Sequence, residues 1–299
     1  MTEITMLDGG TGRELRRIGA PFRQPEWSAL ALIEAPEFVR RVHESYVAAG
    51  ADVITTNSYS LVPFHIGAER FATAGEALAS LSGRLAREVA DAAPRDIAVA
   101  GSLPPVCGSY RPDWFDAGVA RPVLATLVRA LRPHSDHWQA ETLSAIEEAS
   151  LVREVVGSDG KPLWISFTVE DGIETTSEPA LRSGQLVRDA VDAIVGIGAQ
   201  AILFNCSQPE VMGAAVAAAR ERLVQLGKAD MIRIGVYANA FPPQGVAAEA
   251  NATLHEIRPD LTPRGYAVWA QDWVRRGATV IGGCCGIGPE HIAALRAAM

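Results

Sequence analysis

Strand-like and helix-like segments alternate along the whole chain, and this alternation is the feature that most constrains its fold. Short apolar runs are followed by longer stretches whose apolar residues recur with helical periodicity. The eight predicted strands are residues 6–7, 52–59, 96–103, 136–142, 162–169, 201–206, 232–237 and 279–283. The eight predicted helices are residues 36–50, 68–93, 123–131, 145–156, 186–198, 210–226, 266–276 and 289–298. Alternation at this spacing indicates βαβ units and a parallel sheet.

The number of βα units indicates how this sheet closes. Eight units in 299 residues fit a (β/α)₈ barrel, which usually takes ~250 residues. The alternative is an open, doubly wound sheet with a helical appendage. No Ser/Pro-rich linker and no block of like charges divides the sequence. We therefore predict an α/β fold with one TIM barrel, a single domain over residues 1–299.

Composition and charge exclude several functional classes. The formal net charge is −8 and the isoelectric point is about 5.3, whereas a surface for nucleic acid or an anionic membrane needs a basic patch. No apolar run reaches the ~18 residues of a membrane span, and the first residues lack a signal-peptide pattern. The four cysteines are too few for a disulfide scaffold. We expect a cytoplasmic protein without nucleic-acid or membrane partners; a homo-oligomer is compatible with the sequence.

Three of the cysteines stand at the ends of two predicted strands. Cys206 follows one apolar run, and Cys284 and Cys285 follow another that ends in glycines. If the strand ends lie together, three sulfurs converge and leave the fourth position of a tetrahedral zinc ion for a substrate. Adjacent cysteines in a regular strand point to opposite faces, but the flanking glycines let the backbone turn. The alternative is two buried cysteines and an accidental pair. Cys107, in a Pro- and Gly-containing loop, is expected to be a spectator thiol.

Other polar side chains also stand where predicted strands end, which is the catalytic end of a TIM barrel. Together with the three cysteines, the rim residues are Asp8, Asn57, Ser102, Glu141, Thr168, Cys206, Asn239, Cys284 and Cys285. Each has a simpler interpretation. Asp8 could cap a helix, Glu141 could be a solvated charge, and Asn57 could be a turn residue instead of a substrate contact.

A set of short motifs, spread from residue 6 to the C-terminal helix, matches one known enzyme family. The motifs are Asp8-Gly9-Gly10-Thr11-Gly12 with Glu14-Leu15, Trp27-Ser28-Ala29, Thr56-Asn57-Ser58-Tyr59, Glu141-Thr142 with Glu148-Ala149, Ser166-Phe167-Thr168, Asn205-Cys206 and Gly282-Gly283-Cys284-Cys285-Gly286. Together they resemble the homocysteine S-methyltransferases. That family includes betaine-dependent and S-methylmethionine-dependent enzymes and the homocysteine module of methionine synthase.

The resemblance implies a zinc-dependent methyltransferase that converts homocysteine to methionine. By position in the motifs, Cys206, Cys284 and Cys285 would bind the zinc, and Asp8 and Glu141 would hold the amino group of homocysteine. Zinc coordination deprotonates a thiol, and the thiolate is the nucleophile. No further catalytic residue is implied. Without metal, Cys284 and Cys285 are expected to oxidise readily.

The methyl donor is less constrained, because residues 103–110 and 238–243 depart from the family's pattern. Both segments are expected to border the donor side of the pocket. Five aromatic residues near the rim favour a small cationic onium donor, since ring faces attract such a centre. These residues are Trp27, Tyr59, Phe64, Tyr110 and Trp114.

Two other functional classes stay open. One is a zinc-dependent lyase or hydrolase that uses a metal-bound water, although three thiolates would weaken the Lewis acidity that it needs. The other is a homocysteine-binding module that serves a partner with a corrinoid or folate domain, since this sequence contains no such domain.

Overall fold

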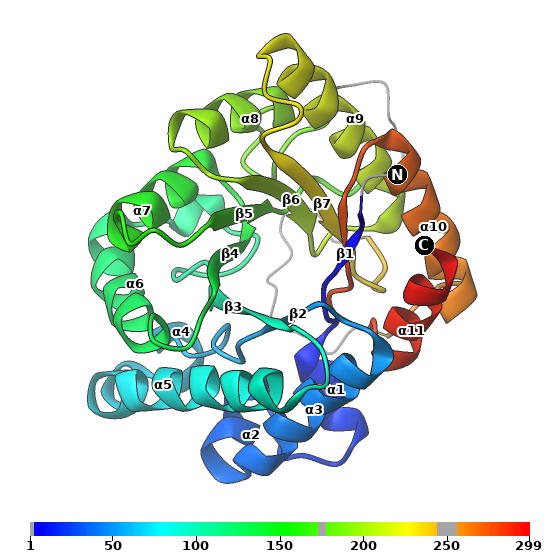
Figure 1. The fold of residues 1–299 in the computed structure, drawn as a ribbon. Helices are drawn as coiled ribbons and strands as arrows, with labels where there is room; N and C mark the ends of the chain where they lie inside the picture. Colours follow the sequence, from blue (N-terminus) through cyan, green and yellow to red (C-terminus); the bar gives the residue numbers. More distant parts are fainter. Residues whose placement is uncertain (1–2, 173–177, 244–255) are drawn as a thin grey trace.

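The computed structural model describes residues 3–172, 178–243 and 256–299. Eight parallel strands form one sheet in the order β1-β8-β7-β6-β5-β4-β3-β2, and the ring closes where Leu7 pairs with Val53 (Figure 1). The strands are β1 Thr5–Met6, β2 Val53–Thr55, β3 Ala98–Leu103, β4 His137–Leu143, β5 Leu163–Phe167, β6 Ala201–Asn205, β7 Arg233–Tyr237 and β8 Val280–Ile281. The predicted TIM barrel is confirmed, and the open-sheet alternative is wrong.

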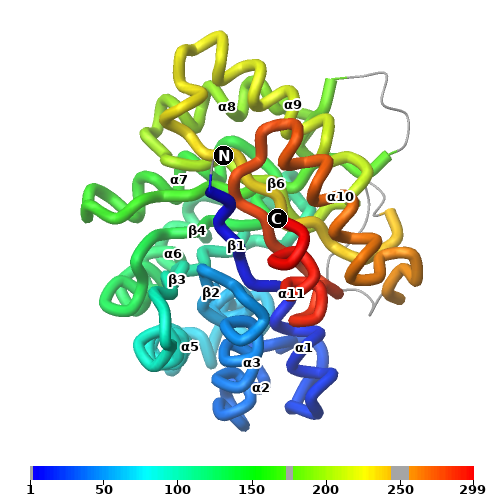
Figure 2. The backbone as a smooth tube through the Cα atoms, turned by 45° about the vertical axis from the view of Figure 1, so that its right-hand side comes forward, coloured from blue at the N-terminus to red at the C-terminus, as the bar shows by residue number. Residues whose placement is uncertain are grey.

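Helices surround this barrel (Figure 1 and Figure 2). They are α1 Thr11–Arg17, α2 Ser28–Glu34, α3 Pro36–Ala49, α4 Pro63–Ile66, α5 Ala68–Ala92, α6 Ala117–Leu131, α7 Ile146–Val156, α8 Val187–Gly196, α9 Pro209–Gln225, α10 Pro263–Arg276 and α11 Pro289–Ala298. The short helices α1, α2 and α4 are additional to the predicted set. Single residues fix several of the helix ends. The Asp116 carboxylate caps the start of α6 by accepting hydrogen bonds from the backbone amides of Gly118 and Val119. At their C-terminal ends, α3 and α10 stop at Gly50 and Gly277, which adopt the left-handed conformation.

Six of the eight predicted strands are longer than the real ones, and the ends of β2 and β8 show why. The chain leaves the sheet after Thr55, because the next residues form turns in which Ser58 bonds back to Thr56. It leaves again after Ile281, where Gly282 crosses so close to β1 that an added Cβ would lie 2.5 Å from the Cβ of Leu7. Both exits occur at the carboxyl ends of strands.

The barrel has two hydrophobic clusters, one outside the sheet and one inside it. The outer cluster joins strands to helices and contains large buried side chains such as Trp138 and Trp273. The inner cluster consists of Leu7, Val53, Ala100, Trp164, Ala201, Leu203, Tyr237 and Val280. The polar side chains of β4, namely His137, Gln139 and Glu141, turn toward the barrel interior. The ring of His137 packs against that of Trp164 in a tilted arrangement, with centroids 4.2 Å apart.

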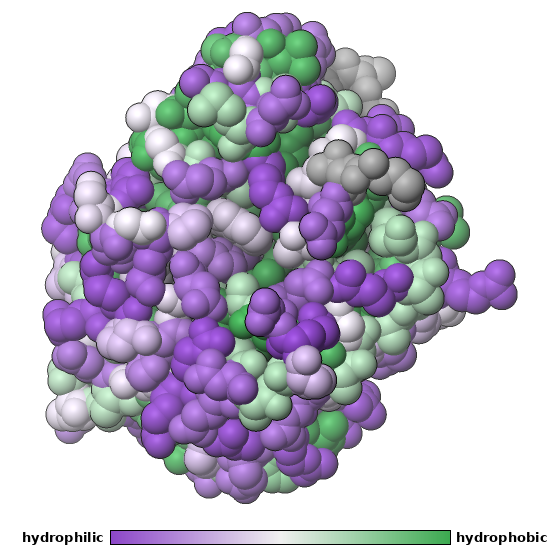
Figure 3. All heavy atoms as spheres, in the orientation of Figure 1, coloured by the Kyte–Doolittle hydropathy of each residue, from purple (hydrophilic) through white to green (hydrophobic). Residues whose placement is uncertain are grey.

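The molecular surface is mainly polar. The face seen in Figure 1 is mostly hydrophilic, with hydrophobic side chains exposed in small groups (Figure 3). None of the helices in the described ranges is long and apolar enough to cross a membrane.

Candidate metal and substrate site

A cavity of about 180 Å³ lies where the strands end and collects the metal ligands and the acceptor contacts that the sequence predicts. Its lining includes Asp8, Asn57, Glu141, Cys206, Cys284 and Cys285. These residues come from five different strand ends or the loops after them. Parallel closure of the sheet therefore brings together residues that are separated by up to 277 positions, as the numbers of Asp8 and Cys285 show.

The three cysteines form one compact sulfur cluster. Their Sγ atoms all lie within 4.8 Å of one another, and no other group of three or more potential metal ligands occurs in the described part of the chain. The exit from β7 supports two of them: the amide of Cys206 donates to the Tyr237 carbonyl at 3.4 Å, and that of Cys284 donates to the Ala238 carbonyl at 3.0 Å. Although β7 separates β6 from β8, both cysteines therefore reach the same point above it.

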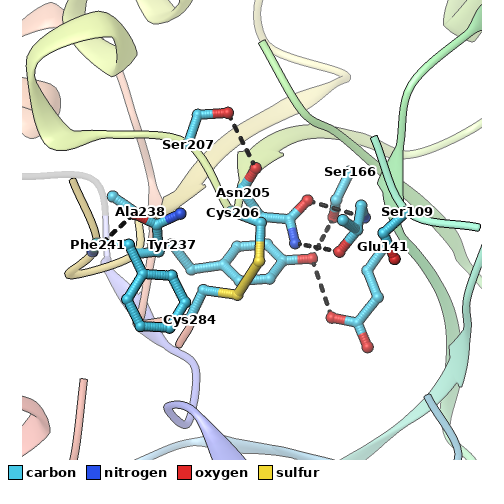
Figure 4. Close-up of a disulfide and its surroundings, with 12 residues drawn as sticks. Ser109, Glu141, Ser166, Asn205, Cys206, Ser207, Tyr237, Ala238, Phe241 and Cys284 are labelled. Atoms are coloured by element: carbon cyan, nitrogen blue, oxygen red, sulfur yellow. Dashed lines mark hydrogen bonds between the residues drawn. A yellow bond between two sulfur atoms is a disulfide. The ribbon is translucent and has the colours of Figure 1, made fainter. Parts of the chain in front are cut away.

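In this structure Cys206 and Cys284 form a disulfide, with Cα atoms 5.8 Å apart (Figure 4). Cys285 is a free thiol. The sequence predicts oxidation at Cys284 and Cys285, and the structure instead joins Cys284 to Cys206. The Sγ atom of Cys285 also lies within 4.8 Å of the two joined sulfurs, so all three stay in one cluster.

The reduced cluster has the donor set of a zinc site. Tetrahedral geometry with Zn–S bonds of about 2.3 Å places sulfurs roughly 3.8 Å apart. Three sulfurs within 4.8 Å of one another need only small side-chain shifts to reach that spacing. Burial raises the pKa of the Cys285 thiol to about 11, so this thiol stays protonated at neutral pH unless a metal ion displaces its proton. The residues present therefore fit a metal ion.

The acidic side of the cavity is formed by Asp8 and Glu141. The carboxylate of Asp8 accepts two hydrogen bonds from Thr55, from its amide at 2.7 Å and from its hydroxyl at 3.0 Å. One oxygen of Glu141 accepts from the Ser102 hydroxyl, and the other accepts from the Tyr237 hydroxyl at 3.4 Å. Both carboxylates are thus held by neutral donors on neighbouring or facing strands.

Burial changes the acidity of these two carboxyl groups. Burial, together with the nearby charge of Glu141, raises the pKa of Asp8 from 3.8 to about 7, against the hydrogen bonds from Thr55. Burial also raises the pKa of Glu141 from 4.5 to about 7, although the hydroxyl donors oppose this. Two buried acids with raised pKa values form a site that a cation would stabilise, because an opposite charge favours the ionised form.

Asn57 has a clear structural contact as well as a place in the cavity lining. Its side-chain amide donates to the Ser28 carbonyl at 3.1 Å, which fixes the start of α2 against the turn after β2. Asn239, another rim candidate, accepts from the amide of Phe241 at 3.1 Å, which is the contact of a turn residue.

The aromatic prediction is only partly right. Trp27, Tyr59 and Tyr110 line the cavity. Phe64 and Trp114 do not belong to its lining, and they are 45% and 37% exposed. These two rings lie against each other on the surface instead, with centroids 6.3 Å apart.

Sequence reasoning missed several lining residues, among them Arg13, Phe22, Tyr237 and Phe241. Arg13 lies in α1, and its guanidinium stands 5.2 Å from the ring centre of Phe241. Arg13 and Phe241 lie in segments that are not strand ends, so a search of the strand ends could not find them. Tyr237 is different: it is the last residue of β7, so the same rule that selected Glu141 could have found it.

Backbone strain is concentrated around this cavity. Within the described ranges, four non-glycine residues have a positive φ: Trp27 at 49°, Tyr110 at 64°, Thr142 at 63° and Cys206 at 52°. All four line the cavity. Such conformations cost about 1–3 kcal/mol each and persist where the surrounding structure enforces them, often at functional sites.

Comparisons with known proteins agree with this geometry. A family model described as homocysteine S-methyltransferase matches residues 5–299. The homocysteine S-methyltransferase of Escherichia coli (strain K12) is 30% identical over 314 residues, which cover 99% of this chain and 95% of that protein. A selenocysteine methyltransferase of Astragalus bisulcatus is 25% identical over 320 residues, which cover 96% of this chain and 90% of that protein.

Solved structures lead to the same family. The Escherichia coli homocysteine methyltransferase MmuM, in a metallated form and in an oxidized form, matches with a TM-score of 0.77 and 28% identity. The match covers 99% of this chain and 96% of each MmuM chain. The chain therefore belongs to the homocysteine S-methyltransferase family.

Proposed function

We propose that this protein transfers a methyl group from a small onium donor to the thiol of homocysteine, giving methionine, and that it uses zinc. The observation that carries the proposal is the presence of three sulfurs within 4.8 Å of one another in the same cavity as two buried carboxyl groups. A thiol amino acid has a thiol group for the sulfur cluster and an ammonium group for the two carboxyl groups.

Cys206, Cys284 and Cys285 are proposed to hold the zinc ion as thiolates. The disulfide between Cys206 and Cys284 must first be reduced, which takes two electrons and two protons from a thiol reductant. The compartment that we propose is the cytoplasm, where thiols are kept reduced. When bound, zinc keeps the acceptor thiol in its thiolate form at neutral pH. The metallated form of MmuM supports a metal in this family.

Asp8 and Glu141 are proposed to bind the ammonium group of homocysteine. In their charged forms these two carboxylates supply a pair of hydrogen-bond acceptors. Without a bound cation, burial raises the pKa of each to about 7. Asn57 is proposed as a further substrate contact through the same lining. With its amino end fixed, homocysteine has its sulfur directed toward the cysteine cluster. The acceptor sulfur is then already oriented for the reaction, which lowers the entropic cost of the transfer step.

The donor is proposed to lie against Trp27, Tyr59 and Tyr110. A ring face attracts an onium centre by about 0.5–2 kcal/mol. In the transfer step the acceptor sulfur attacks the methyl carbon in line. The new S–CH₃ bond forms as the bond from methyl to onium centre breaks, and the donor leaves neutral with the electron pair. No acid catalyst is required, because the onium centre is positively charged before the transfer and becomes neutral when it takes the electron pair.

The test is an assay of reduced, zinc-loaded protein with homocysteine and four parallel donors: S-methylmethionine, S-adenosylmethionine, betaine and methyl-folate. Selenocysteine serves as a second acceptor, because one relative carries that activity in its name. Methionine formation with an onium donor supports the proposal. Turnover with the folate alone would refute the onium donor, and no turnover with any donor would refute the activity.

A further inference from the structure

Tyr237 joins the two halves of the cavity. Its ring belongs to the inner hydrophobic cluster and is 4% exposed. Its backbone carbonyl accepts from the amide of Cys206 at 3.4 Å, and the next residue, Ala238, supports Cys284 in the same way. Its hydroxyl points away from the sulfurs, toward Glu141 (Figure 4). One residue therefore contacts both the cluster and the acidic side.

The hydroxyl of Tyr237 is the centre of a small polar network inside the barrel. It lies 2.6 Å from the hydroxyl oxygen of Ser166 on β5 and 3.4 Å from a carboxylate oxygen of Glu141 on β4. The side-chain amide of Gln139 donates to it at 3.3 Å. β5 and β6 stand between β7 and β4 in the sheet, so Tyr237 reaches Glu141 across the barrel interior.

The Tyr237 hydroxyl can act both as a donor and as an acceptor of hydrogen bonds in this network. A tyrosine hydroxyl has one proton, and its oxygen can accept from other groups. Gln139 donates to that oxygen, and the tyrosine hydroxyl in turn lies in donor geometry to both the Ser166 hydroxyl oxygen and the Glu141 carboxylate. Its single proton is therefore shared between these two acceptors, one of which is Glu141. A tyrosine hydroxyl is ordinarily neutral at physiological pH, so it is available as a donor. The other oxygen of Glu141 is held by Ser102 on β3. The carboxylate is thus fixed at both oxygens.

We propose that Tyr237 is a positioning residue for acceptor recognition: its hydroxyl fixes the carboxylate of Glu141 in the orientation that meets the ammonium group of the thiol acceptor. The inference rests on the proposed function, and it adds that recognition of the amine depends on a residue that does not touch the substrate amine itself. A freely rotating Glu141 would have to be ordered by each incoming acceptor, which would weaken binding.

Tyr237→Phe tests this, because it removes one hydroxyl and keeps the ring. We expect kcat/KM for homocysteine to fall roughly tenfold, through KM more than kcat. For 4-mercaptobutanoate, which is homocysteine without its amino group, the change should be less than about twofold. Zinc content should match wild type. The control is Tyr46→Phe, which removes another buried hydroxyl, 3.2 Å from the Ile287 carbonyl and outside the cavity lining; its acceptor preference should be that of wild type.

A double-mutant cycle separates positioning from general damage. If Tyr237 acts through Glu141, Tyr237→Phe should cost little more in a Glu141→Gln background, so the two effects on homocysteine are not additive. Additive losses, or equal losses for homocysteine and 4-mercaptobutanoate, would overturn the inference. If Tyr237→Phe does not fold, Ser166→Ala perturbs the same hydroxyl and must give a smaller loss that is also selective for the amine. Wild-type protein inactive with every donor would instead refute the proposed function.

Discussion

A Cβ atom on Gly10 would lie 2.6 Å from the carbonyl oxygen of Cys284 and 3.1 Å from the Cα of Cys285. The start of α1 therefore presses directly on the peptide bond between the two adjacent cysteines. Gly10 has φ −71° and ψ 98°, which other residues also adopt, so glycine is required here by space. The Asp8-Gly9-Gly10 segment thus supports the sulfur cluster as well as the acidic side.

Gly10→Ala should weaken both metal binding and the fold. The new methyl group must displace the Cys284 carbonyl, and overpacking of this kind costs about 1–3 kcal/mol. Thermal unfolding and zinc content per chain measure the two effects. Gly196→Ala is the matched control, since no atom lies within 4 Å of the added Cβ at the end of α8. Normal stability and zinc content in Gly10→Ala would contradict the steric argument.

Removing any cluster cysteine should remove the metal. Cys206→Ser, Cys284→Ser and Cys285→Ser each leave two sulfur ligands, and we expect loss of most zinc and of methyl transfer. Elemental analysis of the reduced proteins checks this. Cys107→Ser is the control, because Cys107 contacts the Asp116 carbonyl on the surface and lies outside the cluster. Full zinc content in Cys284→Ala protein is the result that would exclude the proposed ligand set.

Glu141→Gln should weaken acceptor binding and leave zinc in place. The variant loses one charged hydrogen bond to the ammonium group, worth roughly 1.5–3 kcal/mol, which is about ten- to hundredfold in affinity. Steady-state kinetics with homocysteine at saturating donor give the acceptor KM. An unchanged KM and kcat would show that Glu141 does not bind the acceptor and is an ordinary polar residue of the rim.

The raised pKa values of Asp8 and Glu141 predict opposite pH trends for binding and stability. Ammonium binding needs charged carboxylates, so kcat/KM for homocysteine should fall as the pH drops through about 7. In the metal-free, acceptor-free protein both folded pKa values lie above the unfolded values of 3.8 and 4.5. Their contribution to stability is therefore complete below about pH 4 and is lost as the pH rises through about 7.

Two pH series check this pair of trends. One measures initial rates at low homocysteine concentration, and the other measures thermal unfolding of the metal-free protein. Asp8→Asn and Glu141→Gln should each flatten the stability profile between about pH 4 and 7, because the neutral amide no longer titrates. A wild-type stability profile that rises across this range in step with these two groups would show that their pKa values are not raised.

Strand-end reasoning predicted the barrel and the meeting of Asp8, Glu141 and the three cysteines, because closure of a parallel sheet places all strand ends on one rim. It failed where side chains enter from elsewhere. Arg13 reaches the cavity from α1, a helix of seven residues with too little periodicity to be recognised. Trp114 was expected in the pocket, but Arg111 covers its ring at 3.7 Å on the surface. Such contacts depend on loop paths that residue patterns do not encode.

The seam of the barrel lies at the acidic side of the cavity. Leu7 and Val53 close the ring, and the residue after Leu7, Asp8, accepts a hydrogen bond from the amide of Thr55 on the neighbouring strand β2. An acceptor that ionises Asp8 strengthens this bond, since a charged carboxylate is the better acceptor. Homocysteine binding should therefore slow hydrogen–deuterium exchange at the Thr55 amide, so that one backbone proton reports both the closure of the ring and the occupancy of the site.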